Sequence, residues 1–352
     1  MKKGKSKYIK KGDKLRKVKI NIRDIAKLAN VSVATVSRVI NENPNVSEKT
    51  RRRVLKIIQE YDYYPSASAQ NLSKSRTQIA ALIIPYERGF ILSDAFFPPL
   101  IKGTTETLDQ NEYNIMLSAL EVPYIPEKYL SLYKRGIVDG YILANVKKDD
   151  PFPEMLYEEN IPFVSIGKIS SKLKRYPYVD SDNIKGAYDA TLYFLEKGHK
   201  RIALLKGAQT YNFIQERYEG YTLALKKYGL KPDPKLIVEE TLTIDGGYRA
   251  MKKLLKIDDP PTAVFSCSDY MVIGAINAII EAGLDIPEDV AIIGFDDLYI
   301  NARIDPPIAS VKQEIEEIGK EAAKLFLQIL KDPINYESKI IPAKFIWRKS
   351  AG

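Results

Sequence analysis

The stretch INIRDIAKLANVSVATVSRVIN, residues 20–41, decides how the rest of the chain is interpreted. Its first half has apolar residues at the spacing of one helix face: Ile22, Ile25, Ala26 and Ala29. Asn30 and Val31 interrupt that pattern, and the hydroxyl of Ser32 can cap a second helix over 33–40 by accepting a free backbone N–H. Two short helices joined by a tight turn predict a helix-turn-helix.

The second helix has a small outer face, formed by Val33, Ala34, Ser37 and Arg38, while its apolar residues Val36, Val39 and Ile40 can face inward. Ser47 can cap a third helix, which carries basic residues on its early turns: Arg51, Arg52, Arg53 and Lys56. Five of its residues are expected to pack inward: Val54, Leu55, Ile57, Ile58 and Tyr61. Helical hairpins are common, but a basic helix beside this one favours contacts with DNA phosphates.

Residues 20–72 resemble the N-terminal headpiece of the lactose-repressor (LacI) family of bacterial transcription regulators. The motifs DIAKLANVS, ATVSRVIN, VSEKTRRRV and YYPSASAQNL stand in the family's order and spacing. The resemblance implies a homodimeric regulator, most often a repressor, whose headpieces at 20–64 read a near-palindromic operator in double-stranded DNA. On this basis the outer face of the second helix enters the major groove, and Thr35 and Ser37 contact phosphates.

Residues 65–77 are expected to form a hinge helix and a linker. Ser66 can cap a short helix that includes Gln70 and Leu72, and such a helix is too short to be stable alone. The resemblance implies that it orders in the minor groove of DNA, where Leu72 would insert between base steps. Ser66 and Gln70 stand where the family often has asparagine or arginine, and a plain linker is the alternative.

The positive charge of the chain is concentrated near its start. Residues 1–19 hold ten Lys and Arg against one acidic residue, and 20–76 hold ten against five. The rest of the 352 residues hold 34 against 39, so a basic head precedes a mildly acidic body. This asymmetry suits a DNA-binding head on a ligand-binding body. Residues 1–19 themselves are expected to be a disordered, solvated tail that can add non-specific attraction to phosphates.

The composition excludes several classes of protein. A single cysteine, Cys267, rules out an internal disulfide and a cysteine-based zinc site, and a single histidine, His199, makes a histidine-based metal or catalytic site improbable. The sequence has no nucleophile–base pair and no phosphate-loop spacing, so neither an enzyme nor a bound cofactor is expected. The lysine-rich start lacks the apolar core of a secretory signal and no run could span a membrane, which favours the cytoplasm.

From residue 78 onward, apolar runs alternate with amphipathic helical segments. Strands are predicted at 79–85, 114–120, 139–146, 161–167, 201–207, 236–240, 262–268 and 290–297. Helices are predicted at about 97–110, 127–135, 153–160, 183–197, 213–228, 246–256, 270–282 and 314–331. Alternation of this kind predicts parallel sheets covered on both faces, and eight units call for two doubly wound lobes with a cleft between them.

This core, residues 78–352, also resembles the LacI family, whose core shares its fold with periplasmic sugar-binding proteins. The matching pieces include VDGYIL, IPFVSIG, ERYEGYTLAL, PTAVFSCSDYMVIGAINAI and GLDIPEDVAIIGFDD. The resemblance implies an effector between an N-terminal lobe, about 78–180 and 308–335, and a C-terminal lobe, about 181–307 and 336–352. It also implies dimer contacts near 97–110, 114–120 and 266–282.

Six residues are candidates for binding the effector: Phe96, Phe97, Arg217, Ser268, Asp269 and Asp296. Arg217, in QERYEGY, has the planar donor group that suits adjacent oxygens, with a surface arginine as the alternative. Asp296 and Ser268 end strands, where ligands bind in open α/β sheets. Asp269 can equally cap the following helix. One of the two phenylalanines is expected in the core, with Phe96 facing the cleft. Asp182 is expected to cap a helix, with a contact in the cleft as the alternative.

The expected effector is a sugar or sugar derivative, because forked donors, carboxylates and an aromatic wall suit a polyhydroxylated ring. Tyr211, Phe213 and the long loop with Tyr86 and Phe90 could add aromatic walls for a second ring. A purine is the alternative, although purine-responsive relatives usually have arginine where Tyr211 stands. A solute-binding protein of a transport system is the alternative from another class of protein. The headpiece and the lack of a secretory signal argue against this alternative.

Overall fold

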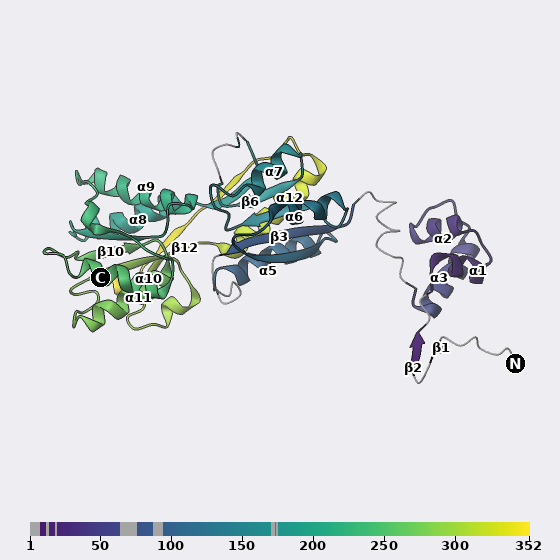
Figure 1. Ribbon diagram of the computed structural model, residues 1–352, viewed down its shortest axis with the longest axis horizontal. Helices are drawn as coiled ribbons and strands as arrows, with labels where there is room; N and C mark the ends of the chain where they lie inside the picture. The colour runs from purple at the N-terminus through teal and green to yellow at the C-terminus, as the bar shows by residue number, and fades with distance from the viewer. Residues whose placement is uncertain are drawn as a thin grey trace. The chain divides into compact units, whose positions relative to one another are not determined.

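The computed structural model describes residues 8–11, 14–17, 20–63, 76–86, 94–169, 173 and 175–352. The chain divides into two compact units, Met1–Thr77 and Gln78–Gly352, which are considered separately below (Figure 1). No helix of the described residues is both long and apolar enough to cross a membrane. The predicted hinge residues Ser66, Gln70 and Leu72 lie outside the described residues, as does Phe90.

The first unit contains the predicted helix-turn-helix: α1 (Ile22–Ala29), α2 (Val33–Ile40) and α3 (Glu48–Tyr61). Asn21 and Asp24 form a reciprocal capping box at the start of α1, and Ser32 caps α2 by accepting the N–H of Thr35 at 3.1 Å. The three helices enclose a small apolar core of Ile25, Ala26, Ala29, Val36, Val39, Val54 and Tyr63.

One packing prediction for α3 is wrong. Leu55 is 46% exposed, whereas Val54 is fully buried and Ile57, Ile58 and Tyr61 pack against the headpiece core. Residues at i, i+3, i+4 and i+7 from Val54 share one face of a helix, and Leu55 follows Val54 by one position, so it lies to the side of that face.

The basic segment before α1 differs from the disordered tail that was expected. Strands β1 (Tyr8–Lys11) and β2 (Lys14–Lys17) pair antiparallel, with Tyr8 opposite Lys17 and Lys11 opposite Lys14. Two residues separate the strands in the sequence, which is the commonest spacing for a β-hairpin. The high lysine content of the segment favoured the prediction of disorder, because a highly charged segment can bury little apolar surface.

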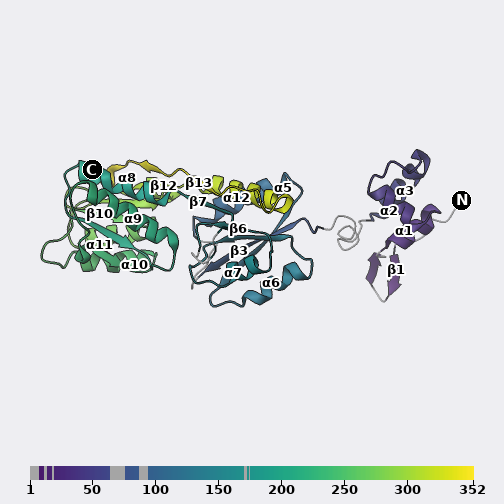
Figure 2. The ribbon, with the colours of Figure 1, turned by 90° about the horizontal axis from the view of Figure 1, so that it is seen from above.

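The N-terminal lobe of the core has a six-stranded parallel sheet in the order β13-β7-β6-β5-β3-β4. Its strands are β3 (Ile79–Tyr86), β4 (Asn114–Glu121), β5 (Gly140–Ala144), β6 (Phe163–Ile166), β7 (Tyr178–Ser181) and β13 (Lys339–Ile341). Helices α5 (Phe97–Asp109) and α12 (Ile315–Lys331) cover one face, and α6 (Pro126–Lys134) and α7 (Phe152–Glu158) cover the other (Figure 2).

The C-terminal lobe repeats this plan with the order β14-β12-β11-β10-β8-β9. Its strands are β8 (Ile202–Lys206), β9 (Ile237–Glu239), β10 (Ala263–Ser266), β11 (Ala291–Asp296), β12 (Ala309–Lys312) and the antiparallel edge strand β14 (Lys344–Ile346). Helices α8 (Asn183–Glu196) and α9 (Asn212–Lys227) pack on one face, and α10 (Ile244–Leu254) and α11 (Asp269–Glu281) on the other. The predicted fold class of two doubly wound lobes is therefore confirmed.

The chain changes lobe later than predicted at two of its three crossings. β12 is hydrogen-bonded to β11, so the chain stays in the C-terminal lobe through Lys312 instead of leaving it near 308. β13 is hydrogen-bonded to β7, so the chain stays in the N-terminal lobe through Ile341 instead of leaving it near 335. These strands have three or four residues, and only their sheet partners decide the lobe to which they belong.

Candidate functional site

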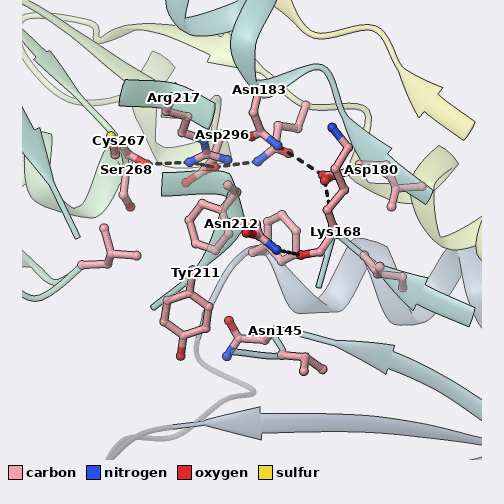
Figure 3. Close-up of a pocket in the computed structure, with 18 of the residues that line it drawn as sticks. Asn145, Lys168, Asp180, Asn183, Tyr211, Asn212, Arg217, Cys267, Ser268 and Asp296 are labelled. Carbon is pink, nitrogen blue, oxygen red and sulfur yellow. Dashed lines mark hydrogen bonds and ion pairs between the residues drawn. The ribbon is translucent and has the colours of Figure 1, made fainter. Parts of the chain in front are cut away.

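A cleft lies between the two lobes of the core, at the carboxyl ends of their strands (Figure 3). Asn145 follows β5, Lys168 follows β6, Cys267 and Ser268 follow β10, and Asp296 ends β11. The cleft holds about 970 Å³ of space, part of it open to solvent. Its position is the one at which open α/β sheets bind ligands.

Arg217 is the central side chain of this cleft. It is 4% exposed, and its guanidinium carbon lies 3.6 Å from the ring centroid of Phe295 and 4.8 Å from that of Phe213. Its Nε donates to Oδ1 of Asn183 at 3.0 Å, and NH1 donates to the carbonyl of Cys267 at 2.6 Å. Ring stacking and two hydrogen bonds fix the plane of the guanidinium and so preorganise a forked donor.

Asp296 faces Arg217 across the end of β11. One carboxylate oxygen lies 3.5 Å from NH1 of Arg217 and accepts a hydrogen bond from Nε2 of Gln313 at 2.7 Å. Burial raises the pKa of Asp296, and the positive charge of Arg217 partly opposes that rise. The backbone φ of Asp296 is +113°, a strained value that is typical of functional positions in non-glycine residues.

A second polar network joins the lobes beside the first crossing. The ammonium of Lys168 lies 2.6 Å from one oxygen of Glu216, whose other oxygen accepts a bond from Nδ2 of Asn183 at 3.1 Å. The same Nδ2 lies 3.2 Å from Oδ1 of Asp180. Burial, followed by the nearby charge of Glu216, raises the pKa of Asp180 to about 6. Lys168 and Asp180 belong to the N-terminal lobe, whereas Asn183 and Glu216 belong to α8 and α9.

Three further hydrogen bonds cross the cleft. Nδ2 of Asn212 donates to the carbonyl of Lys168 at 2.7 Å, and the N–H of Lys148 donates to the carbonyl of Thr210 at 2.9 Å. On another side of the cleft, the N–H of Ala95 donates to the hydroxyl of Tyr270 at 2.9 Å. Together with the ion pair of Lys168, these bonds hold the lobes in a closed arrangement.

Aromatic side chains supply the apolar walls. Phe96 lines the cleft and is half-buried, while Phe97 also borders the cleft but is 6% exposed and packs in the core of the N-terminal lobe. Tyr211 and Phe213 lie at the start of α9 with ring centroids 5.5 Å apart. These four rings suit the apolar faces of a flat or ring-shaped ligand.

Asp269 does not line the cleft, and its predicted role as a ligand contact is corrected. Its fully buried carboxylate accepts the N–H of Leu298 at 2.9 Å and the hydroxyl of Ser310 at 2.7 Å. It therefore ties α11 to the segments after β11 and in β12. Ser268, not Asp269, is the N-cap of α11, and it lines the cleft as predicted. Asp182 caps α8, as predicted.

Sequence reasoning missed several polar residues of the lining: Asp94, Asn145, Lys168, Asp180, Asn183, Asn212, Tyr270 and Gln313. Lys168 could have been found, because it follows directly on the strand predicted at 161–167. Asn145 lay within the strand predicted at 139–146, and the structure ends that strand at Ala144. Gln313 carries no comparable signal, since the strand before it was not predicted. Asn183 begins a predicted helix, and nothing in the sequence shows that it faces the cleft.

The structure also places the predicted DNA-binding residues of the headpiece. Val33 is 41% exposed, and Ala34 and Arg38 are exposed on the same outer surface of α2. Ser37 is half-buried, and the hydroxyl of Thr35 lies 2.9 Å from that of Ser32 inside the cap. An accessible α2 with an arginine beside small side chains matches the shape of a recognition helix.

Comparison with known proteins accounts for both units. Residues 21–66 match the family described as "Bacterial regulatory proteins, lacI family", and residues 191–351 match "Periplasmic binding protein-like domain". The regulator CelR of Thermobifida fusca is 35% identical over 86% of this chain and 89% of its own length. The repressor CytR of Escherichia coli K12 is 32% identical over 94% of this chain and 95% of its own. The chain belongs to the LacI family.

As a LacI-family protein the chain is a DNA-binding transcription regulator and not an enzyme. The solved complex of a CelR regulator with cellobiose is similar to this chain with a TM-score of 0.74 and 32% sequence identity. The match covers 94% of this chain and 100% of the CelR chain. These matches confirm the predicted membership of the LacI family. They disfavour a transport-associated solute-binding protein, whose fold matches the core alone.

Proposed function

We propose that this LacI-family regulator responds to a neutral sugar of one or two rings bound in the interlobe cleft. The observation that carries the proposal is the buried pair of Arg217 and Asp296, set among aromatic rings. A hydroxyl both donates and accepts, so adjacent hydroxyls can bond to a guanidinium fork and a carboxylate at once. In this proposal Phe96, Phe97 and Ser268 complete the contacts.

The charges of the cleft favour a neutral ligand over a carboxylate or a phosphate. The two cationic residues in the described lining are Lys168 and Arg217, and each faces a carboxylate, of Glu216 and Asp296 respectively. Asp94 and Asp180 add two more acidic groups to the lining. An anionic ligand would displace these pairings and meet the remaining carboxylates, which costs electrostatic free energy in a buried site.

The relatives support a sugar. The CelR regulator, similar over nearly the whole chain, is solved with cellobiose, a disaccharide of two neutral rings. The neighbouring rings of Tyr211 and Phe213 also line the cleft and could pack against a second sugar ring. On this basis the proposed ligand class includes disaccharides and glycosides as well as monosaccharides.

Ligand-induced stabilisation of the full chain tests the proposal. We expect cellobiose, other neutral disaccharides or hexoses to raise the midpoint of thermal unfolding, because a ligand at a hundred times its Kd adds about 2.7 kcal/mol to the free energy of unfolding. Glucuronate, a sugar phosphate and adenine are the comparison ligands. Stabilisation by adenine alone, or by the anionic sugars alone, would contradict a neutral sugar.

We further propose that the regulator acts as a cytoplasmic homodimer on a near-palindromic operator. Exposed apolar side chains within the predicted dimer segments support a homodimer: Leu117 on β4 is 40% exposed and Ile280 on α11 is 57% exposed.

Two headpieces related by a two-fold axis read two related half-sites. The proposed DNA contacts of each headpiece are Val33, Ala34, Thr35, Ser37 and Arg38. Sedimentation of the protein as a monomer at micromolar concentration would contradict the proposed homodimer.

The ion pair between Lys168 and Glu216 gives a test of lobe closure. Glu216→Gln removes the negative charge without changing any lining residue, so we expect the effector sugar to bind about fivefold more weakly, as for a partly exposed pair worth about 1 kcal/mol. Glu219→Gln, at an exposed position of the same helix, is the matched control. Equal affinities of the two variants by titration calorimetry would show that the pair does not support closure.

A further inference from the structure

The hairpin of β1 and β2 lies outside the headpiece described for the family, which begins at residue 21. Its two strands contain Lys10, Lys11, Lys14, Arg16 and Lys17, five cationic residues among eight. The segment 1–19 as a whole carries ten cationic residues and one acidic one. No separate stretch of 19 residues in the chain carries as large a net positive charge.

The pairing register works against the hairpin in water. Lys11 lies opposite Lys14, and like charges directly opposite each other destabilise an antiparallel pair. An isolated two-stranded hairpin is marginally stable even without such repulsion. A polyanion would offset the repulsion, so the hairpin gains stability when it lies against one.

The tether keeps the hairpin close to any DNA that the headpiece holds. β2 ends at Lys17 and α1 begins at Ile22, so the intervening backbone spans at most about 18 Å at ~3.6 Å per residue. The strands add roughly 13 Å at about 3.3 Å per residue. Double-stranded DNA carries a phosphate charge every ~1.7 Å along its axis, so several phosphates fall within this reach.

We propose that the two strands of the hairpin, Tyr8–Lys11 and Lys14–Lys17, are a second DNA contact that binds phosphates flanking each operator half-site. It recognises charge and not sequence, because lysine ammonium groups on a backbone ribbon bind phosphates as point charges. It therefore raises the affinity for operator and unrelated DNA by the same factor, and sequence discrimination stays with the helix-turn-helix.

Four substitutions in the full chain test this contact: Lys10→Gln, Lys11→Gln, Lys14→Gln and Lys17→Gln together. A control of equal charge change replaces four exposed lysines of the C-terminal lobe, at 226, 231, 235 and 256. Binding to an operator duplex and to an unrelated duplex of equal length is measured by fluorescence anisotropy at several salt concentrations. Each lost phosphate contact lowers the slope of log affinity against log salt by about 0.9.

For the hairpin variant we expect the slope to fall by about two to four and the affinity for both duplexes to fall at least tenfold at ~0.1 M salt. Hydroxyl-radical protection outside the half-sites should disappear. Four Lys→Arg changes at the same positions should restore the slope, which separates lost charge from misfolding. A slope equal to that of the C-terminal control, a loss confined to the operator, or a preference for anionic lipid vesicles over DNA would overturn the proposal.

Discussion

Arg217→Ala is expected to abolish the response of DNA binding to the effector. The change removes the forked donor from the cleft and leaves the carboxylate of Asp296 without its cation. Hydrogen bonds from a charged group are worth about 1.5–3 kcal/mol each, so losing two to the ligand weakens its binding by at least about a hundredfold. Titration calorimetry with the effector sugar and a gel shift with operator DNA measure the two effects.

The same variant should also be less stable, because removing one partner of a buried ion pair costs about 3–5 kcal/mol. Arg217→Lys keeps the positive charge but not the planar fork, so it should recover much of the stability while binding the sugar poorly. Arg249→Ala, an exposed arginine of α10 outside the cleft, is the control and should keep both properties. Normal sugar affinity in Arg217→Ala would remove Arg217 from the proposed site.

The second large effect is expected in the headpiece. Arg38→Ala should lower the affinity for the operator by about ten- to a hundredfold, because a good side-chain contact to a base is worth about 1–3 kcal/mol. Arg38 is exposed at the end of α2, on the same outer surface as Val33 and Ala34. The caps and the core of the headpiece do not involve its side chain, so its removal should leave the fold intact.

Measuring the affinity of the Arg38→Ala variant for unrelated DNA distinguishes a contact to a base from a contact to a phosphate. If Arg38 reads a base, the variant loses discrimination between operator and unrelated DNA and its salt slope changes by about one at most. Arg135→Ala is the control, since Arg135 is an exposed arginine of the core, outside the headpiece. An equal loss of affinity for both kinds of DNA would assign Arg38 to a phosphate.

Features that depend on local spacing could be predicted from the sequence. The helices of the headpiece could be predicted because their apolar residues recur at a helical period and because Ser32 and Ser47 can cap the second and third helices. The buried strands of the core could be predicted because both faces of a parallel sheet are covered, which makes their sequences continuously apolar. Arg217, Ser268 and Asp296 followed from the family resemblance and from the rule that ligands lie beyond strand ends.

Features that depend on partners far along the chain could be seen only in the folded structure. The carboxylates of Asp269 and Asp296 could be told apart only once Ser310 and Leu298 were seen to engage the first, and Arg217 and Gln313 the second. The lobe of β12 and β13 depends on which sheet offers free backbone groups, since strands this short carry little pattern. Likewise, the pairing of Lys168 with Glu216 across the cleft follows from the approach of two lobes, which no local spacing encodes.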